Sequence, residues 1–219
     1  MRIKMCGVTN PSDAVLVSRC GADFVGLILA TSPRQVTVEV AREVVRALPP
    51  DGQPVLVFRD APAEVVCDAV NATGCRWVQL HGRETLADIE TLRRRCPHLR
   101  IIKGWEVGTG DAEGDLMAYL AADAGQLIDV VILDAPKGGP HPGYERLGEL
   151  SRQLRARPPE VWCAGGLTAG NVAAALAAGC YDGVDVASGV EVSPGRKDET
   201  LVRRFIAAVR STARRSASP

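Results

Sequence analysis

A carboxylate that directly follows an apolar run is the strongest single sign of a functional site in this sequence. Asp134 comes straight after Val130-Val131-Ile132-Leu133. A charge at this position is expensive to bury unless it has a function or a partner, and the partner available nearby is Lys137. Cys6 ends a similar run at residues 3–6. On its own it is weaker evidence, because a lone cysteine with apolar neighbours is more often a core residue.

Two glycine-containing pairs, Gly165-Gly166 and Ser188-Gly189, each follow an apolar run near the end of the chain. Glycine lets the main chain approach a ligand closely, so that N–H groups from both segments can converge on one anion. The alternative is that these glycines only form tight turns. Because both segments carry the same pattern, we favour a phosphate site.

Three further polar residues lie within an apolar run or in the segment that follows one. Arg34 follows Thr31-Ser32-Pro33 and can clamp a carboxylate with two hydrogen bonds, although an ordinary surface arginine also explains it. His81 and Asp185 either bind a ligand or satisfy loop amides. His98 and His141 join no such group, and we assign them no role.

The elements that must position these residues alternate regularly. Strand-like apolar runs occur at residues 3–6, 24–30, 55–58, 77–80, 101–105, 130–133, 161–164 and 184–186. Helix-like segments lie between and after them, at residues 11–20, 38–48, 63–72, 84–95, 115–122, 144–155, 171–178 and 198–211. Such alternation predicts parallel strands joined by crossover helices, and continuous apolar runs are typical of strands buried on both faces.

Eight such units in 219 residues predict an α/β fold, a single-domain (β/α)8 TIM barrel over residues 1–211. We expect residues 212–219, rich in Ser, Ala and Arg, to form a disordered tail. The alternative, a doubly wound open sheet, usually has a glycine-rich turn after its first strand, and Cys6-Gly7-Val8-Thr9 lacks that pattern. In a (β/α)8 barrel, the residues at the ends of the strands meet at one mouth.

Composition excludes several classes of function. The 26 basic residues balance the 26 acidic ones, which gives no electrostatic reason to expect nucleic acid or a membrane surface as a partner. No apolar run approaches the length of a membrane span, and we expect a cytoplasmic protein. The seven cysteines form no Cys-x-x-Cys pair, so the sequence predicts neither a metal site nor a disulfide framework.

Short motifs in consistent order resemble the phosphoribosylanthranilate isomerase family of tryptophan biosynthesis over nearly the whole chain. They are Lys4-Met5-Cys6-Gly7-Val8-Thr9-Asn10, Ser32-Pro33-Arg34, Val78-Gln79-Leu80-His81-Gly82, Leu133-Asp134, Ala164-Gly165-Gly166-Leu167, Val184-Asp185-Val186 and Ser188-Gly189-Val190-Glu191.

The resemblance implies an Amadori rearrangement of an aminoribosyl phosphate, an aldose–ketose isomerisation without metal or organic cofactor. Carried over by position, Asp134 is the general acid and Cys6 the general base, which needs local positive potential to act as a thiolate. Arg34 is expected to hold the anthranilate carboxylate, with His81 and Asp185 as further substrate-binding residues. The resemblance places phosphate on Gly165, Gly166, Ser188 and Gly189. A monomer or a homodimer fits equally.

Three departures from the family pattern leave other functions open. Residues 138–146 lack the usual lysine and threonine, Arg59 replaces an apolar residue, and Ala187 replaces the first of two serines. One alternative is the same rearrangement on a different N-substituted phosphoribosylamine in a specialised pathway. Another is a non-catalytic barrel that binds a sugar phosphate, although such a barrel needs neither Cys6 nor Asp134.

Overall fold

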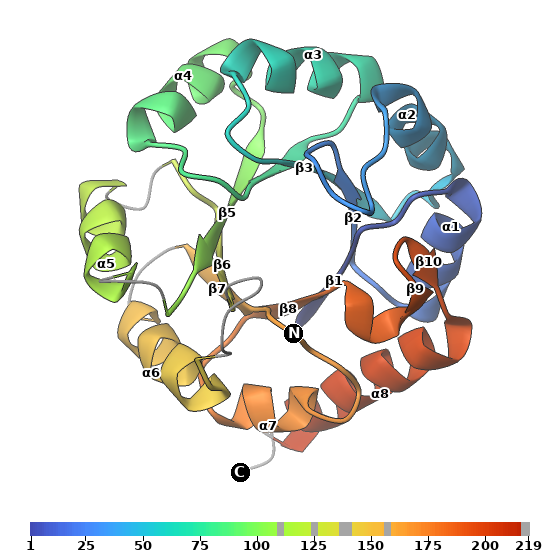
Figure 1. Cartoon of the computed structure of the whole chain (residues 1–219), viewed down its shortest axis with the longest axis vertical. Helices are drawn as coiled ribbons and strands as arrows, with labels where there is room; N and C mark the ends of the chain where they lie inside the picture. Colours follow the sequence, from blue (N-terminus) through green and yellow to red (C-terminus); the bar gives the residue numbers. More distant parts are fainter. Residues whose placement is uncertain (109–111, 124–126, 136–141, 156–158, 216–219) are drawn as a thin grey trace.

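Eight strands and eight helices alternate along the described chain, and the strands close into one parallel barrel (Figure 1). This computed structural model describes residues 1–108, 112–123, 127–135, 142–155 and 159–215. The predicted (β/α)8 fold is confirmed. The strands are β1 (Arg2–Cys6), β2 (Phe24–Ile28), β3 (Gln53–Phe58), β4 (Trp77–Leu80), β5 (Arg100–Glu106), β6 (Val130–Asp134), β7 (Glu160–Cys163) and β8 (Gly183–Val186). The helices are α1 (Pro11–Cys20), α2 (Val38–Ala47), α3 (Ala63–Thr73), α4 (Leu86–Arg95), α5 (Ala112–Asp123), α6 (Tyr144–Leu154), α7 (Val172–Ala177) and α8 (Glu199–Arg215).

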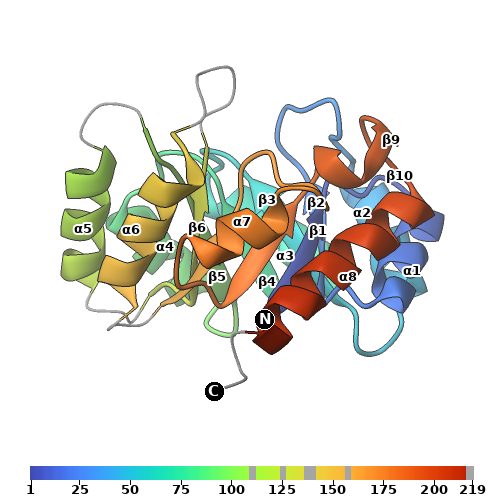
Figure 2. The ribbon, with the colours of Figure 1, turned by 90° about the horizontal axis from the view of Figure 1, so that it is seen from below.

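The first strand closes the barrel, because β1 pairs in parallel with both β2 and β8. In this register Lys4 lies opposite Phe24 on one side and Asp185 on the other. Figure 2 shows the loop after β2 at the end of the barrel opposite the N terminus of the chain. The loops that follow the strands therefore gather at one mouth.

Alternate residues of each strand point into the barrel or outward to the helices. Phe24, Trp77 and Trp162 form an interior aromatic layer, with the Phe24 ring centroid 5.1 Å from each of the two indole centroids. Val131 and Leu133 belong to the other set and are fully buried against the helices. Because both sets are apolar, the strands read as continuous apolar runs.

The helix boundaries follow local capping. The Asn10 side chain accepts a hydrogen bond from the Asp13 N–H at 2.9 Å and caps α1. Helix α7 begins at Val172 without a side-chain cap. Residues 168–171 form a turn of their own: the Asn171 side chain accepts the Thr168 N–H, and the Thr168 hydroxyl accepts the Gly170 N–H.

Three short elements were too brief to be read from the sequence pattern. A 3₁₀ turn, η1 (Ser188–Val190), follows β8 and leads into a hairpin of β9 (Glu191–Ser193) and β10 (Arg196–Lys197). At the end of the chain α8 continues to Arg215, so the helix includes residues 212–215 of the expected tail, and residues 216–219 lie outside the described residues. Within the described residues, no helix is long and apolar enough to span a membrane.

Candidate active site

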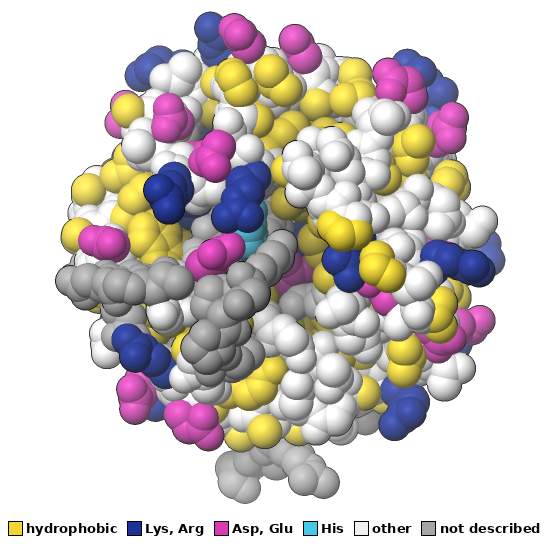
Figure 3. Space-filling model, in the orientation of Figure 1, with side chains coloured by type: hydrophobic (Ala, Val, Ile, Leu, Met, Phe, Trp, Pro, Cys, Tyr) yellow, Lys and Arg dark blue, Asp and Glu magenta, His cyan; other side chains and the backbone are white. Residues whose placement is uncertain are grey.

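A pocket of about 390 Å³ lies at the mouth of the barrel. It collects all but one of the residues that the sequence singled out as a site: Cys6, Arg34, His81, Asp134, Gly165, Gly166, Asp185 and Ser188. Figure 3 looks onto this mouth and shows a histidine, acidic side chains and basic side chains around the central hollow. The rule that barrel strands end at one face thus brings together residues from β1, β6 and β8 and from the loops after β2, β4, β7 and β8.

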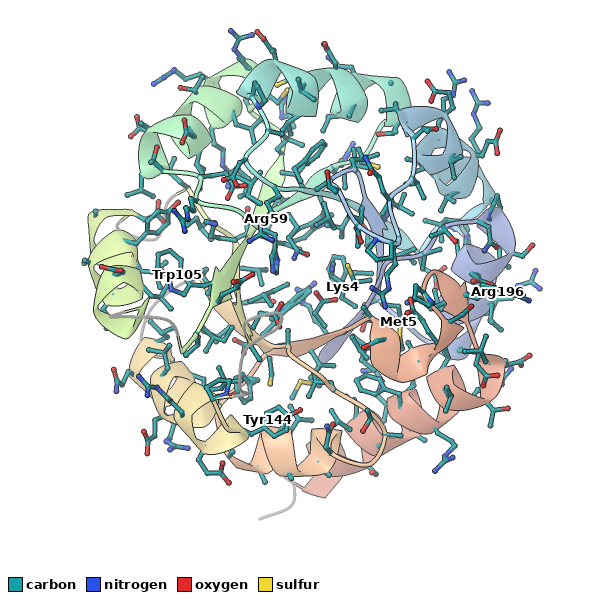
Figure 4. The ribbon with its side chains drawn as sticks, in the orientation of Figure 1. Lys4, Met5, Arg59, Trp105, Tyr144 and Arg196 are labelled. Atoms are coloured by element: carbon teal, nitrogen blue, oxygen red, sulfur yellow. The ribbon has the colours of Figure 1, made fainter. Side chains whose placement is uncertain are left out.

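Beneath the pocket lies a buried ion pair that joins the first and last barrel strands. Lys4 Nζ is 2.9 Å and 3.0 Å from the two carboxylate oxygens of Asp185, and the Lys4 side chain is completely buried (Figure 4). Burial alone would lower the pKa of Lys4, but the Asp185 carboxylate and the Cys6 sulfur outweigh it and raise that pKa. Lys4 is therefore a fixed positive charge inside the barrel.

The Cys6 thiol lies beside this ammonium. A Cβ on Gly26 of the neighbouring strand would be 2.9 Å from Cys6 Sγ and 3.1 Å from Lys4 Nζ, so the absence of a side chain on β2 makes room for both. The local positive potential expected for a basic thiol is thus present. Burial is nevertheless the largest effect and raises the pKa of Cys6, while Lys4 and Lys197 oppose it. The positive potential that the sequence analysis requires for a thiolate is therefore present, but burial has the larger effect on the pKa of Cys6.

On the opposite wall, His81 lies next to the carboxyl group at the end of β6. His81 Nε2 is 3.3 Å from Asp134 Oδ2, and both side chains are mostly buried. His81 Nδ1 is 2.8 Å from the amide nitrogen of Gln79. The ion pair between Asp134 and Lys137 that we considered from sequence falls outside the described residues, because residues 136–141 are not described.

Arg34 lines the pocket but is already engaged by a carboxylate of the chain. Its Nε lies 3.0 Å from both Glu191 carboxylate oxygens, and its Nη2 lies 2.7 Å from one of them. Lys197 Nζ binds the same carboxylate at 2.8 Å and the main-chain oxygen of Cys6 at 2.6 Å. Burial raises the pKa of Glu191, but the bonds from Arg34 and Lys197 outweigh it and leave the pKa below its usual value.

The two glycine segments form the wall at β7 and β8. Gly165 and Gly166 both have positive φ angles, +92° and +61°, which favour glycine. Among the described residues, the main-chain N–H groups of Gly166 and Ser188 have no protein acceptor. Gly189, the fourth residue of the predicted phosphate site, does not line the pocket. A Cβ there would lie 1.9 Å from the main-chain oxygen of Leu167, so Gly189 lets η1 pack against the loop after β7.

Arg59 stands at the rim of the same pocket, at the end of β3 (Figure 4). Its Nη2 is 3.5 Å from Glu106 Oε1, and about half of its side chain is exposed. His98 is exposed after α4 and lines none of the site, and His141 lies outside the described residues. The described residues contain no cluster of three or more side chains suited to a metal ion.

Four polar residues of this site were not singled out from sequence: Lys4, Gln79, Glu191 and Lys197. Lys4 precedes Cys6 by two residues within β1, and Gln79 of β4 precedes His81, the first residue after that strand, by two. The period of two in a strand places each pair on one face, so this spacing was the signal that could have found them. Glu191 and Lys197 lie on the unpredicted hairpin, and no pattern in the sequence pairs them.

Comparisons with known proteins agree on one family. The sequence profile of the family described as N-(5'phosphoribosyl)anthranilate (PRA) isomerase matches residues 3–208. A relative from Pseudomonas paraeruginosa, N-(5'-phosphoribosyl)anthranilate isomerase, is 38% identical over 218 residues, which covers 98% of this chain and 97% of that protein.

Two solved structures have the same fold over their whole length. Phosphoribosyl anthranilate isomerase from Thermotoga maritima superposes with a TM-score of 0.84 at 29% identity and covers 96% of this chain and 99% of its own. A second structure of such an isomerase has a TM-score of 0.82, 29% identity and the same coverage. It is a complex with reduced 1-(o-carboxyphenylamino)-1-deoxyribulose 5-phosphate.

Proposed function

Because the chain belongs to the N-(5'-phosphoribosyl)anthranilate isomerase family, we propose that it catalyses the Amadori rearrangement of N-(5'-phosphoribosyl)anthranilate to 1-(o-carboxyphenylamino)-1-deoxyribulose 5-phosphate. This is the isomerisation of an aminoaldose to an aminoketose within tryptophan biosynthesis. The reaction needs a proton donor at the ring oxygen and a base at C2′.

The observation that carries this proposal is the meeting of Cys6 and Asp134 in one pocket with the two glycine segments. The thiol and the carboxyl group come from β1 and β6, which β7 and β8 separate on the shorter way around the barrel. A sugar between them would face a different proton-transfer group on each side. A purely binding barrel has no need of this arrangement.

The steps follow from these positions. Asp134 delivers a proton to the ring oxygen, the bond from that oxygen to C1′ breaks, and the nitrogen lone pair forms the protonated Schiff base. The Cys6 thiolate then removes the C2′ proton, and the electron pair of that bond forms a C1′–C2′ double bond while the nitrogen becomes an amine. The resulting enol tautomerises to the ketone as C1′ gains a proton and the C2′ hydroxyl loses one. Lys4 supports the second step, because its ammonium favours the thiolate form of Cys6.

The two ends of the substrate fit different walls. The N–H groups of Gly166 and Ser188 are suited to phosphate oxygens, because the positive φ of Gly166 turns its main chain outward without a side chain in the way. The anthranilate carboxylate is assigned to Arg34. Glu191 occupies Arg34 Nε and Nη2, so Nη1 is the nitrogen for which the described residues provide no acceptor.

Turnover of freshly prepared phosphoribosylanthranilate tests the proposal, because the fluorescence of the anthranilate group follows the reaction directly. We expect saturable turnover that Cys6→Ser lowers by about 10²-fold or more. Absence of turnover at high enzyme concentration, with the ligand still bound, would favour the alternative of a non-catalytic barrel.

One observation favours a second candidate, the same rearrangement on a different amine. Arg59 places a guanidinium at the rim of the pocket, where the family usually has an apolar residue. This cation can meet an anionic substituent that anthranilate lacks. A panel of N-substituted phosphoribosylamines, compared by kcat/KM, separates the two candidates.

A further inference from the structure

A row of three polar side chains runs across the barrel mouth from β4 to β6. Gln79 is 2% exposed on the inner face of β4, and its amide nitrogen is 2.8 Å from His81 Nδ1. The other ring nitrogen, Nε2, is 3.3 Å from Asp134 Oδ2. His81 is thus held between an amide and the proposed acid, and the chemistry of each neighbour decides which nitrogen carries the ring proton.

The amide orientation selects one tautomer. An amide NH₂ group only donates, so the nitrogen that faces it must accept and must be unprotonated. A neutral imidazole then carries its proton on Nε2, which faces the carboxyl group of Asp134. The reversed amide would place its oxygen against Nδ1 and would move the proton to that nitrogen. The two orientations therefore make opposite predictions that an experiment can separate.

The surrounding strands leave the ring little freedom. A Cβ on Gly104 of β5 would lie 2.2 Å from His81 Nδ1, so the imidazole occupies the place of the missing side chain. The main-chain N–H of His81 donates to the main-chain oxygen of Phe58 at 2.9 Å. In the loop that follows, Glu84 accepts the Gly82 N–H and pairs with the buried Lys103 at 2.9 Å. Ring and loop are fixed before any substrate binds.

Two atoms of the row are buried without a hydrogen-bond partner among the described residues: Gln79 Oε1 and His81 Nε2. The 3.3 Å approach of His81 Nε2 to Asp134 is close enough for a charge contact but does not form an aligned hydrogen bond. Buried polar atoms are nearly always paired, so such exceptions need an explanation. Catalytic hydrogen bonds often become short and aligned only with substrate bound, and both residues line the pocket.

We propose that Gln79 is a positioning residue that keeps the His81 proton on Nε2, so that His81 donates to Oδ2 of Asp134 and leaves Oδ1 to protonate the substrate. After the proton has moved to the ring oxygen, the same N–H stabilises the carboxylate that remains. The catalytic part of this inference rests on the proposed function, whereas the tautomer is a property of the protein alone.

The tautomer is measured by nitrogen NMR on protein labelled with ¹⁵N-histidine. The chain has three histidines, so His98→Gln with His141→Gln leaves His81 as the only signal. At pH 8 we expect the pattern of a neutral ring protonated on Nε2. In Gln79→Met we expect a mixture of tautomers, and in Gln79→Glu a proton on Nδ1, because a carboxylate accepts where the amide donated. Gln53→Met, an exposed glutamine at the start of β3, is the matched control.

Kinetics then test the catalytic part. We expect Gln79→Met to lower kcat about tenfold while KM changes less than about twofold, since part of the value of a positioned acid is lost. Gln53→Met should change neither. A wild-type ring protonated on Nδ1 overturns the inference whatever the activity, and so does an unchanged tautomer with unchanged kcat in a folded Gln79→Met. If the wild-type protein shows the Nε2 tautomer but no turnover, the proposed function fails while the role of Gln79 toward His81 stands.

Discussion

Lys4 and Asp185 face each other across the seam where the first and last strands of the barrel meet, with Nζ 2.9 Å from one carboxylate oxygen. Removal of one partner from a buried pair leaves the other charge unpaired, which costs about 3–5 kcal/mol. Lys4→Met should therefore lower the free energy of unfolding by about that amount, measured in urea. The exposed pair Arg203–Glu199 offers the control, because both side chains are solvated and Arg203→Met should lower the free energy of unfolding far less. If both variants lost the same free energy of unfolding, the buried pair between β1 and β8 would stabilise the protein no more than an exposed pair, contrary to this prediction.

The proton-transfer pair can be tested by conservative substitutions. Cys6→Ser and Asp134→Asn should each lower kcat by about 10²-fold or more, the usual contribution of a positioned acid or base, with a much smaller change in KM. Cys20→Ser, on the outer face of the barrel in α1, should leave both constants unchanged. Turnover within about threefold of the parent protein would remove that residue from the mechanism.

The pH profile should show the raised pKa of Cys6. Burial raises that pKa above the ordinary value of about 8.5. If the thiolate is the base, as we propose, kcat should still be rising with pH at pH 9. Loss of the Lys4 ammonium raises the pKa further, because a positive neighbour favours the thiolate, and the Lys4→Met profile should shift to higher pH. A profile that levels off below pH 7 is incompatible with a Cys6 thiolate as the base.

The proposed phosphate site is tested at Gly166. A Cβ at this position meets nothing within 4 Å, so a substitution acts through the main chain, whose φ of +61° is unfavourable for other residues. Gly166→Val should raise KM about tenfold or more, because the N–H group turns away and the branched side chain blocks the phosphate. Gly74→Val is matched, with a φ of +75° and open space at the end of α3, and should cost stability without a change in KM.

A crystal grown in sulfate gives the direct view of this site. We expect the anion on the N–H groups of Gly166 and Ser188. Sulfate bound elsewhere at the mouth, with these groups unoccupied, would place the phosphate end of the substrate on another wall.

Arg59 decides between the two candidate functions. Half-exposed charges contribute only about 0–1 kcal/mol, so Arg59→Val should change kcat/KM on phosphoribosylanthranilate about fivefold or less if this is the natural substrate. Arg83→Val, an exposed arginine outside the pocket, is the control. A large gain in Arg59→Val, or after a graft of the usual family loop into residues 138–146, would instead indicate a protein adapted to another amine.

The sequence could predict much of this molecule because the barrel repeats one physical rule. Each buried strand is a short apolar run, and each strand end contributes to one mouth, so Cys6, His81 and Asp134 could be placed together without coordinates. The roles of Arg34 and Gly189 depend on partners far along the chain. Arg34 binds Glu191 on a hairpin of only a few residues, and Gly189 packs on the Leu167 main chain. Neither contact produces a periodic spacing of residues that could be recognised in the sequence.

The pKa of Cys6 could not be predicted for a related reason. Sequence places a thiol at a strand end, but its pKa depends on two opposing effects. Loss of water on burial raises the pKa, and the ammonium groups of Lys4 and Lys197 lower it. That balance is a property of three-dimensional burial, and here burial is the larger effect.

The bond from Lys197 to the main chain of Cys6 also bears on how the protein is made. The two residues are 191 positions apart, and Lys4 and Asp185 are 181 apart. A ribosome exposes Cys6 long before it adds the residues that complete the environment of this thiol. Contacts of such separation close long loops, and chain entropy is lost before the contacts stabilise the fold. Closure of the barrel between β1 and β8 therefore also completes the surroundings of Cys6, and a chain that ends before β8 lacks both Asp185 and Lys197.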